Sequence, residues 1–471
     1  MHRKRFRLLF AAWIAAMALV FTVPALRAQD GKGAITPELL GAFRAAVEKD
    51  PRSKALKNAV AGNEIKSLVL DHQAVINHTS QYSNRIKTGD ITNQKGSGRC
   101  WLFAGLNILR PAVMKKYILP NFEISQNYSF FWDKIEKANL FLEGIIATID
   151  KDLDDRLVRF LLEKPIDDGG QWNMVVDLTE KYGVVPAAVM PDTRHVSSTG
   201  EVNDLLSKLL RRDAAELRRL RAEGKGPELL KERKVALLSD IYRLLSYTFG
   251  EPPASFRWRY QDKDEKLSEP KEYTPRQFYK EFIGVDLSQY VCLYDCPAHP
   301  YGKLYRIQFD RDLADRPDFT FANVPIAAVK EAVLKQVLDG EPVWFSCDVG
   351  QENGPSGILK PGIYDYPPLL GLDFTMTKEE RIRYRESIPT HSMVFLGVDL
   401  EAGKPVKWLV ENSWGADKGD KGFLSMYDRW FDEYLYTVVV HRKHLKEEVL
   451  KIFTQEPETL PPWDPMFDGT W

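Results

Sequence analysis

The sequence predicts an α+β fold, because helical and strand-like patterns occupy different parts of the chain. Residues 100–106 are apolar on every side, which is typical of a short buried helix. Residues 202–247 are charged, poor in aromatic residues and apolar at a helical period. From Val291 onward, short runs of β-branched and aromatic residues predict the strands of an antiparallel sheet.

The individual elements follow in chain order. Thr36 caps a helix that opens with Pro37 and ends at Asp50-Pro51. Residues 82–99 read as a polar, glycine-containing loop, and Pro111 ends or kinks the buried helix that begins at or near Cys100. The expected strands are 304–307, 319–321, 343–346, 394–398, 407–410 and 437–440.

The composition is that of an ordinary globular protein. The 471 residues are 44% hydrophobic and 28% charged, so the chain can fold without a metal or disulfide staple. A net charge of -1 gives no overall attraction for nucleic acid or anionic membranes. Ten basic and five acidic residues between Lys208 and Lys234 are best explained as a solvated helix face. We predict no cofactor, no metal and no nucleic-acid partner.

The first 28 residues resemble a secretory signal peptide. A basic start leads into the apolar run 8–24, and small Ala28 marks the expected cleavage point. A membrane anchor is the alternative, since the run approaches the ~18 residues of a span. Polar sequence from Gln29, with no second apolar span, favours cleavage. We expect an exported protein, periplasmic or extracellular, with no span in the mature chain.

Four cysteines are too few for the disulfide framework of a small secreted protein. Cys292 and Cys296 could form one bridge or remain two buried thiols, and both possibilities stay open. No histidine pair near them suggests a zinc site. Cys347 directly follows the expected strand 343–346.

Cys100 is the first candidate for chemistry. A thiol at the start of a helix feels the positive end of the helix dipole, which favours the thiolate. Gln94 lies six residues earlier, where its amide could donate to an oxyanion. Taken alone, such a cysteine is more often a structural core residue.

Two further residues change that interpretation. His391 directly precedes an apolar strand, and Asn412 ends another strand 21 positions later, a separation that suits paired neighbours. A thiol nucleophile needs a base within reach and a third group that orients the base. Cys100, His391 and Asn412 supply these roles in order, and Trp414 could shield the imidazole–amide bond from water.

The flanking motifs resemble papain-like cysteine peptidases, namely Gln94 before Cys100-Trp101, His391 before its strand, and Asn412-Ser413-Trp414-Gly415. The Cys-to-His gap of 291 residues is about twice the papain-type distance of ~130–150 and points to the bleomycin hydrolase, or aminopeptidase C, branch. Other stretches of the chain resemble that branch: residues 130–134, 168–172, 181–186, 344–350 and 462–466.

The resemblance implies a papain-like core of two lobes, one helical and one β-rich, with a helical hook insertion. The implied divisions are a signal peptide at 1–28, a helical lobe at 29–199, a hook near 200–290, a β-rich lobe at 291–450 and a C-terminal arm at 451–471. It also implies a hexameric ring whose active sites face an inner cavity.

The arm implied by the resemblance lies in the active-site cleft and restricts the enzyme to free N-termini. Trp463 and Met466 would anchor it, and its prolines predict an extended path. Two departures are visible: relatives are typically cytosolic, and Trp471 is bulkier than the small residues with which they usually end.

We therefore predict a cysteine aminopeptidase that acts on peptide substrates. One alternative is a papain-like endopeptidase, and another is a ring-shaped assembly that binds without catalysis. The intact Gln, Cys, His and Asn set disfavours the non-catalytic alternative. A redox function for Cys292 and Cys296 is disfavoured too, because three residues separate them and not two.

Overall fold

The computed structural model describes residues 33–467, which divide into residues up to Leu68 and a larger unit from Val69 onward. The first unit contains α1 (Pro37–Lys49) and α2 (Ser53–Gly62), and α3 (Ile65–Val69) crosses the division. As predicted, Thr36 caps α1, accepting from the Leu39 N–H at 3.3 Å. The predicted signal peptide lies outside the described residues. Within residues 33–467, no helix combines the length and apolar character that crossing a membrane requires.

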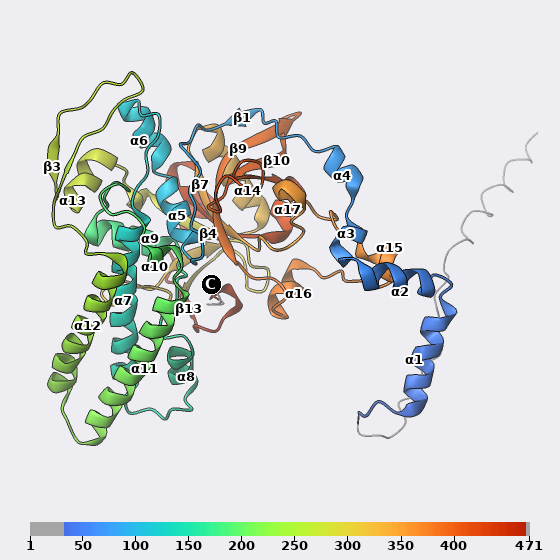
Figure 1. Cartoon of the computed structure of the whole chain (residues 1–471), viewed down its shortest axis with the longest axis horizontal. Helices are drawn as coiled ribbons and strands as arrows, with labels where there is room; N and C mark the ends of the chain where they lie inside the picture. The colour runs from blue at the N-terminus through green and yellow to red at the C-terminus, as the bar shows by residue number, and fades with distance from the viewer. Residues whose placement is uncertain (1–32, 468–471) are drawn as a thin grey trace, which may run out of the picture. The chain divides into compact units, whose positions relative to one another are not determined.

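Helices dominate the first half of the larger unit (Figure 1). Their bounds are α4 (His72–Ile76), α5 (Cys100–Asn107), α6 (Arg110–Tyr117), α7 (Gln126–Ala147), α8 (Arg156–Glu163), α9 (Trp172–Tyr182), α10 (Arg194–Ser197), α11 (Gly200–Ala222), α12 (Pro227–Phe249) and α13 (Pro275–Gln277). A π-helical turn, Phe278–Ile283, follows α13, and a small hairpin joins β2 (Phe256–Trp258) to β3 (Lys271–Tyr273).

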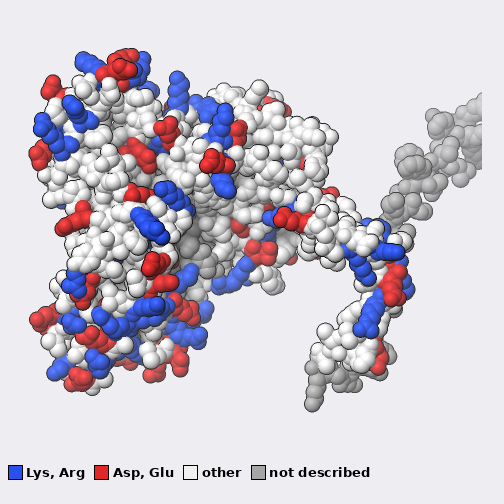
Figure 2. All heavy atoms as spheres, viewed as in Figure 1, with Lys and Arg blue, Asp and Glu red and all other residues white. Residues whose placement is uncertain are grey.

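The charged segment forms the long pair α11 and α12, which packs against α7 (Figure 1). Its apolar stripe is buried at Leu206, Leu210 and Leu217, as the helical period predicts. Basic and acidic side chains are interspersed over this pair (Figure 2). Arg233 pairs with Glu216 and Arg221 with Asp150, so acidic partners offset part of the basic excess.

The second half of the unit is built on one sheet of eleven strands within the described residues. Its order is β13-β5-β6-β4-β12-β7-β9-β10-β11-β8, with β1 also paired to β9. The strand bounds are β1 (Asn84–Arg85), β4 (Tyr290–Tyr294), β5 (Lys303–Ile307), β6 (Thr320–Asn323), β7 (Val343–Cys347), β8 (Ile358–Leu359), β9 (His391–Glu401), β10 (Lys404–Glu411), β11 (Phe423–Tyr427), β12 (Leu435–His441) and β13 (Glu458–Leu460).

The prediction of an antiparallel sheet was only partly right. The central pairs β7–β9, β9–β10 and β7–β12 are antiparallel, but β4–β6, β8–β11 and β5–β13 are parallel. Each parallel pair joins strands separated by a long connection, which frees the second strand from the direction that a hairpin would impose. The α+β class itself is confirmed.

The two faces of the sheet bury different helices because successive side chains of a strand alternate. Trp344 and Val394 belong to the core shared with α5, whereas Phe345 and Phe395 face the core shared with α14 (Ile326–Leu338) and α17 (Asp428–Tyr434). The Trp344 indole donates to the Trp101 carbonyl at 3.1 Å. This contact fixes α5 against the centre of the sheet. Short helices α15 (Tyr366–Leu370), α16 (Lys378–Arg383) and α18 (Glu447–Ile452) complete the lobe.

Candidate active site

Cys100 is the first residue of α5, as predicted, and its side chain is buried. Every residue of this helix is buried, which explains a sequence that is apolar all round. Of the N–H groups in the first helical turn, that of Leu102 donates to the Arg99 carbonyl at 3.0 Å, whereas those of Cys100 and Trp101 face the thiol. The structure thus presents the thiol beside two backbone donors.

The loop before Cys100 is held by the carboxylate of Asp168. This group accepts from the Gly98 N–H at 2.9 Å and from the Lys134 ammonium at 2.8 Å, and the Trp101 indole donates to the Asp168 carbonyl at 2.8 Å. A Cβ on Gly98 would lie 2.8 Å from the Asp168 Cβ, so position 98 has no room for a side chain. We call Asp168 and Lys134 the loop clamp.

The clamp is an ion pair that is almost completely buried. Burial opposes ionisation of Asp168, but the Lys134 ammonium and the Gly98 N–H outweigh it and hold the pKa of this carboxyl well below its usual range. Lys137, one turn further along α7, donates to the Gly169 carbonyl. Two lysines of one helix therefore fix the segment that borders the start of α5.

His391 and Asn412 are joined by a hydrogen bond of 2.8 Å between Nε2 and Oδ1. His391 begins β9 and Asn412 directly follows β10, and these strands pair with Glu411 opposite Val394. The turn between them has positive φ at Ala402 and Gly403, which suits a tight hairpin. The predicted pairing of the two strands is confirmed. Because Oδ1 can only accept, Nε2 carries the proton and Nδ1 is left as a base.

Trp414 covers this pair. Its ring lies 4.6 Å from the His391 ring, centroid to centroid, and the two planes are inclined by 30°. Both His391 and Asn412 are buried. A hydrogen bond shielded from water is stronger than an exposed one, so the indole helps to hold the imidazole in one orientation.

Gln94 is oriented from both ends of its amide. Its Oε1 accepts from the Ser413 hydroxyl at 2.6 Å, and its Nε2 donates to the Ser97 carbonyl at 2.7 Å. A primary amide has two N–H bonds, so the second remains for a substrate oxygen. The backbone N–H of Gln94 also donates to the Ser413 carbonyl at 2.8 Å, which ties this loop to the turn after Asn412.

The thiol lies beside Ser392, the residue that follows His391. Burial raises the pKa of the Cys100 thiol to about 11, although the N–H groups of Ser392, Trp101 and Cys100 lower it. Burial likewise lowers the pKa of His391 to about 4. The helix start alone therefore does not ionise the thiol. Where a buried thiol transfers its proton to a neighbouring imidazole, both charges form together, and the attraction between them offsets the cost of burial.

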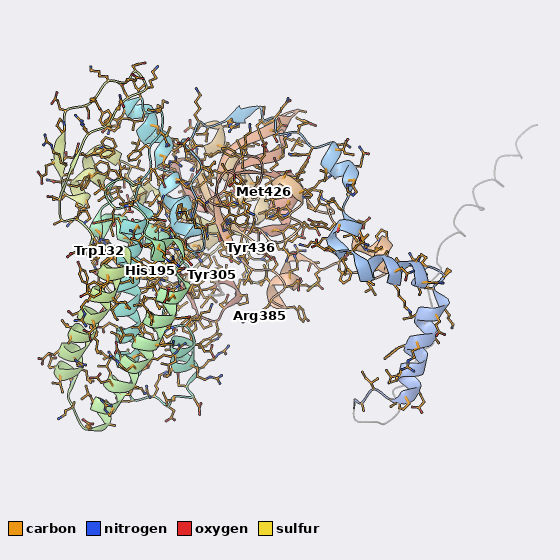
Figure 3. All side chains as sticks on the ribbon, viewed as in Figure 1. Trp132, His195, Tyr305, Arg385, Met426 and Tyr436 are labelled. Carbon is orange, nitrogen blue, oxygen red and sulfur yellow. The ribbon has the colours of Figure 1, made fainter. Side chains whose placement is uncertain are left out.

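The two residues predicted to anchor the C-terminal segment pack against different parts of the molecule, Met466 against the sheet and Trp463 against α8. Met466 is buried in a cluster that includes Tyr305 and Tyr436, and the Tyr294 hydroxyl donates to the Met466 carbonyl at 3.3 Å. Figure 3 labels Tyr305 and Tyr436. The Trp463 ring lies under the Arg156 guanidinium at 3.9 Å. Trp471, which was also predicted to belong to the arm, lies outside the described residues.

The expectation of an extended path is wrong for residues 461–467. The Asp464 N–H donates to the Pro461 carbonyl at 3.0 Å, and Pro465–Phe467 form one 3-10 turn. Proline cannot donate, but its carbonyl can accept, and a proline fits the first position of a helical turn where no N–H is needed. Phe467 then lines a pocket together with Lys137, Gly169 and Gly170, beside the segment that the lysines of α7 fix.

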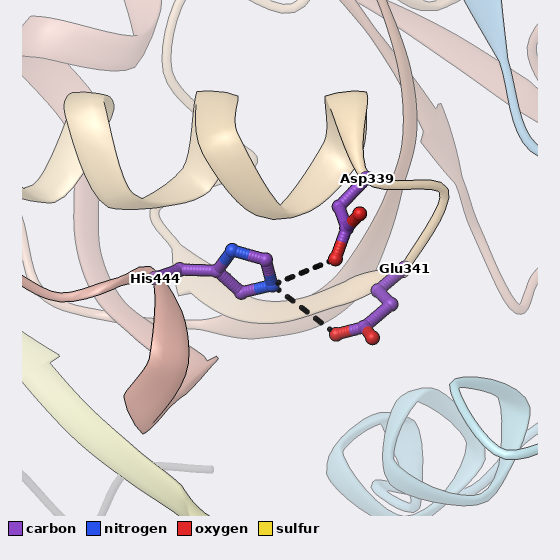
Figure 4. Close-up of side chains that lie close together, drawn as sticks. All are labelled: Asp339, Glu341 and His444. Atoms are coloured by element: carbon purple, nitrogen blue, oxygen red, sulfur yellow. Dashed lines mark hydrogen bonds and ion pairs between the residues drawn. The ribbon is translucent and has the colours of Figure 1, made fainter.

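Among the described residues, one cluster has the composition of a metal site, Asp339, Glu341 and His444 (Figure 4). The Lys443 ammonium lies 2.8 Å from Asp339 and 2.6 Å from Glu341. A cation already neutralises both carboxylates, so we interpret the cluster as an ion-pair network. Cys292 and Cys296 are buried free thiols, which is one of the two states left open.

Sequence reasoning missed the loop clamp and the role of Ser413. Asp168 was noticed only as part of a motif, and nothing in its spacing from Gly98 indicates contact across 70 positions. Lys134 looks like a surface residue in sequence, yet it is fully buried.

We predict that Asp168→Asn destabilises the protein by about 3–5 kcal/mol at pH 7, because the change leaves the buried Lys134 charge unpaired. The pKa of Asp168 is lowered on folding. Its contribution is therefore complete above its ordinary pKa of ~3.9 and is lost only as the pH falls below that value. Chemical denaturation followed by tryptophan fluorescence should show the same decrease in the free energy of unfolding, relative to wild type, at pH 5 and at pH 7.

The control is Asp150→Asn, which removes an exposed partner of Arg221 and should leave stability unchanged. An Asp168→Asn protein as stable as wild type would show that the clamp does not hold the loop.

Comparison with known proteins shows which family the chain belongs to. The model of the Peptidase C1-like family matches residues 34–467. The chain is 42% identical over 423 residues to an Aminopeptidase C of Streptococcus thermophilus, covering 89% of this chain and 95% of that protein. It is 38% identical over 445 residues to a Bleomycin hydrolase of Rattus norvegicus, covering 92% and 98%.

A solved structure agrees. The crystal structure of pepw from Lactobacillus rhamnosis HN001 matches with a TM-score of 0.90 at 41% identity, over 92% of this chain and 99% of that one. The predicted relationship to bleomycin hydrolase and aminopeptidase C is confirmed, and the chain belongs to the Peptidase C1-like family.

Proposed function

We propose that this protein is a cysteine aminopeptidase in which Cys100 is the nucleophile, His391 the general base and acid, and Asn412 the residue that orients His391. The observation that supports the proposal is the buried bond of 2.8 Å between His391 and Asn412, together with the interaction of Ser392, the residue after His391, with the Cys100 thiol. Relatives named Aminopeptidase C and Bleomycin hydrolase support the same activity.

The first step acylates the enzyme. His391 Nδ1 takes the thiol proton, and the Cys100 sulfur attacks the carbonyl carbon of the first peptide bond. The negative charge moves to the carbonyl oxygen, which accepts from the Cys100 N–H and the second N–H of Gln94. The tetrahedral intermediate then collapses: the C–N bond breaks, and the leaving amine takes its proton from His391.

The second step releases the first residue. His391, neutral again, accepts a proton from water as the water oxygen attacks the thioester carbon. The C–S bond breaks, the free amino acid leaves, and the proton returns to the Cys100 sulfur. Asn412 keeps the ring in one orientation through both steps because Nε2 remains bonded to its Oδ1.

We predict that Cys100→Ala abolishes turnover and that Gln94→Ala lowers kcat by roughly 10²–10³, the usual cost of one oxyanion donor. The measurement is hydrolysis of fluorogenic aminoacyl substrates. Cys347→Ala is the matched control, because it removes a buried thiol from the position paired with His391 on β7.

The control should retain activity, and iodoacetamide should label Cys100 before the other cysteines. Loss of activity on labelling of Cys292 or Cys347 would contradict the choice of nucleophile.

We attribute the restriction to free N-termini, which makes the enzyme an aminopeptidase, to the C-terminal arm. Met466 is buried and Phe467 lies beside Gly169 and Gly170, which supports an arm that reaches the acyl side of the cleft. Such an arm would leave room for one or a few substrate residues and place an acidic group near the substrate ammonium. A plain endopeptidase would need this side of the cleft open.

Truncation after Leu460 should therefore increase cleavage of N-acetylated peptides relative to peptides with a free amine. The matched control removes only residues 468–471 and keeps the Met466 anchor. If the truncated enzyme still rejects blocked peptides, specificity for free N-termini comes from elsewhere in the cleft.

We also propose that the protein is exported and assembles as a hexamer through the hook near residues 200–290. The signal-like sequence of residues 1–28 supports export, and the long pair of α11 and α12 supports assembly, as does the relation to bleomycin hydrolase.

Mass spectrometry of the purified protein should give a chain that starts near Gln29, and light scattering should give six copies. A monodisperse monomer at micromolar concentration would contradict the ring, and an intact Met1 in the exported fraction would contradict cleavage.

A further inference from the structure

Ser392 is a buried polar residue to which the proposed mechanism of Cys100, His391 and Asn412 gives no role. It is 1% exposed and follows His391 on β9. Its hydroxyl has no hydrogen-bond partner in the described part of the chain. A buried hydroxyl without a partner is costly, and such a group next to a reactive centre calls for an explanation.

The direction of the Ser392 side chain follows from strand alternation. Val394, two residues further along β9, packs in the core shared with α5, whereas Met393 faces the opposite core. Ser392 therefore shares the face of Val394 and points to α5. β9 packs directly against α5, so the N–H and the hydroxyl of Ser392 lie on the side of the Cys100 thiol, and both favour its charged form.

We propose that the Ser392 hydroxyl is a positioning donor for the nucleophile, held in reserve until the thiolate forms. A neutral thiol is a weak acceptor, so the hydroxyl lacks a good partner in the resting enzyme. A thiolate is a strong acceptor, and the hydroxyl can then donate to it without any movement of the backbone. The donor favours the charged form and thus lowers the free energy of the thiolate–imidazolium pair.

The other ionisable groups nearby are committed elsewhere. His391 on β9 bonds Asn412, and Cys347 on β7 is itself a buried thiol. Of the charged groups on the preceding loop and on α7, Arg99 pairs with Asp192, Lys134 with Asp168 and Lys137 with Asp133. Burial disfavours the thiolate strongly, so one additional donor has a large effect on the ionised fraction.

The test is the pH dependence of Cys100 alkylation by iodoacetamide, measured on the full-length chain. Ser392→Ala should move the acid limb of the rate upward by about one pH unit, since a donor to a charged group is worth roughly that much. At any fixed pH on the rising limb the alkylation rate should fall about tenfold, and kcat/KM should show the same displacement. Ser129→Ala is the matched control, because Ser129 on α7 is also a buried serine whose hydroxyl has no partner among the described residues.

A second pair of variants separates the hydroxyl from packing. Thr and Val have nearly the same shape, but only Thr has a hydroxyl. The acid limb of alkylation should therefore stay near the wild-type pH in Ser392→Thr and move to higher pH in Ser392→Val. The inference is wrong if the acid limb of alkylation lies at the same pH in the Thr and Val variants, or if the limb of Ser392→Ala lies at the wild-type pH. Ser392 would then only fill space.

The inference rests on the proposed role of Cys100, and the two can fail separately. Turnover that survives Cys100→Ala would overturn the proposed function. Turnover lost in Cys100→Ala, together with an unshifted limb in the Ser392 variants, would overturn the Ser392 inference alone.

Discussion

The structure depends on the burial of α5 between the helical lobe and the sheet. Each apolar side chain of this helix, such as Leu102 or Phe103, contributes about 1.5–3 kcal/mol by leaving water. The Trp344 indole fixes the helix to the sheet through the Trp101 carbonyl, and the loop clamp fixes its start to α7. The position of Cys100 relative to β9 is thus set by the core and not by a mobile loop.

Burial of Cys100 and His391 also has a cost. It raises the pKa of the Cys100 thiol and lowers that of His391, so each group alone would stay neutral. The surrounding donors and acceptors are arranged to favour the charged pair: helix-start amides face the sulfur, and Asn412 bonds the imidazole. Trp414 excludes water from that bond. A site of this kind loses reactivity when any one of these partners is displaced.

Phe467, the last described residue, packs against the same segment that borders Cys100. Lys137 and Lys134 hold residues 167–169, and Phe467 packs beside Gly169 and Gly170. A Cβ on Gly170 would lie 2.5 Å from the Trp101 ring, so only glycine allows this segment to approach the helix. The packing of the tail and the placement of the thiol are therefore linked through one short stretch of backbone.

The sequence alone determined the local features. The apolar run from Cys100 specified a buried helix, and the 21-residue spacing of His391 and Asn412 specified paired strands. The Thr36 cap specified the start of α1, and Pro111 specified a break between α5 and α6. These are short-range consequences of side-chain shape, capping and hydrophobic period, which a single segment carries by itself. The family motifs then gave the nucleophile, base and orienter by resemblance.

Only the tertiary structure decided which distant groups meet. Asp168 and Gly98 lie 70 positions apart, Ser413 and Gln94 319 positions apart, and no pattern along the chain encodes either contact. The parallel strand pairs and the turn at residues 461–464 were also decided there, because long connections and prolines leave the direction of the chain to packing. Whether a lysine such as Lys134 is a surface charge or a buried clamp depends on the partner that the fold supplies, since burial of a charge is tolerated only where it is paired.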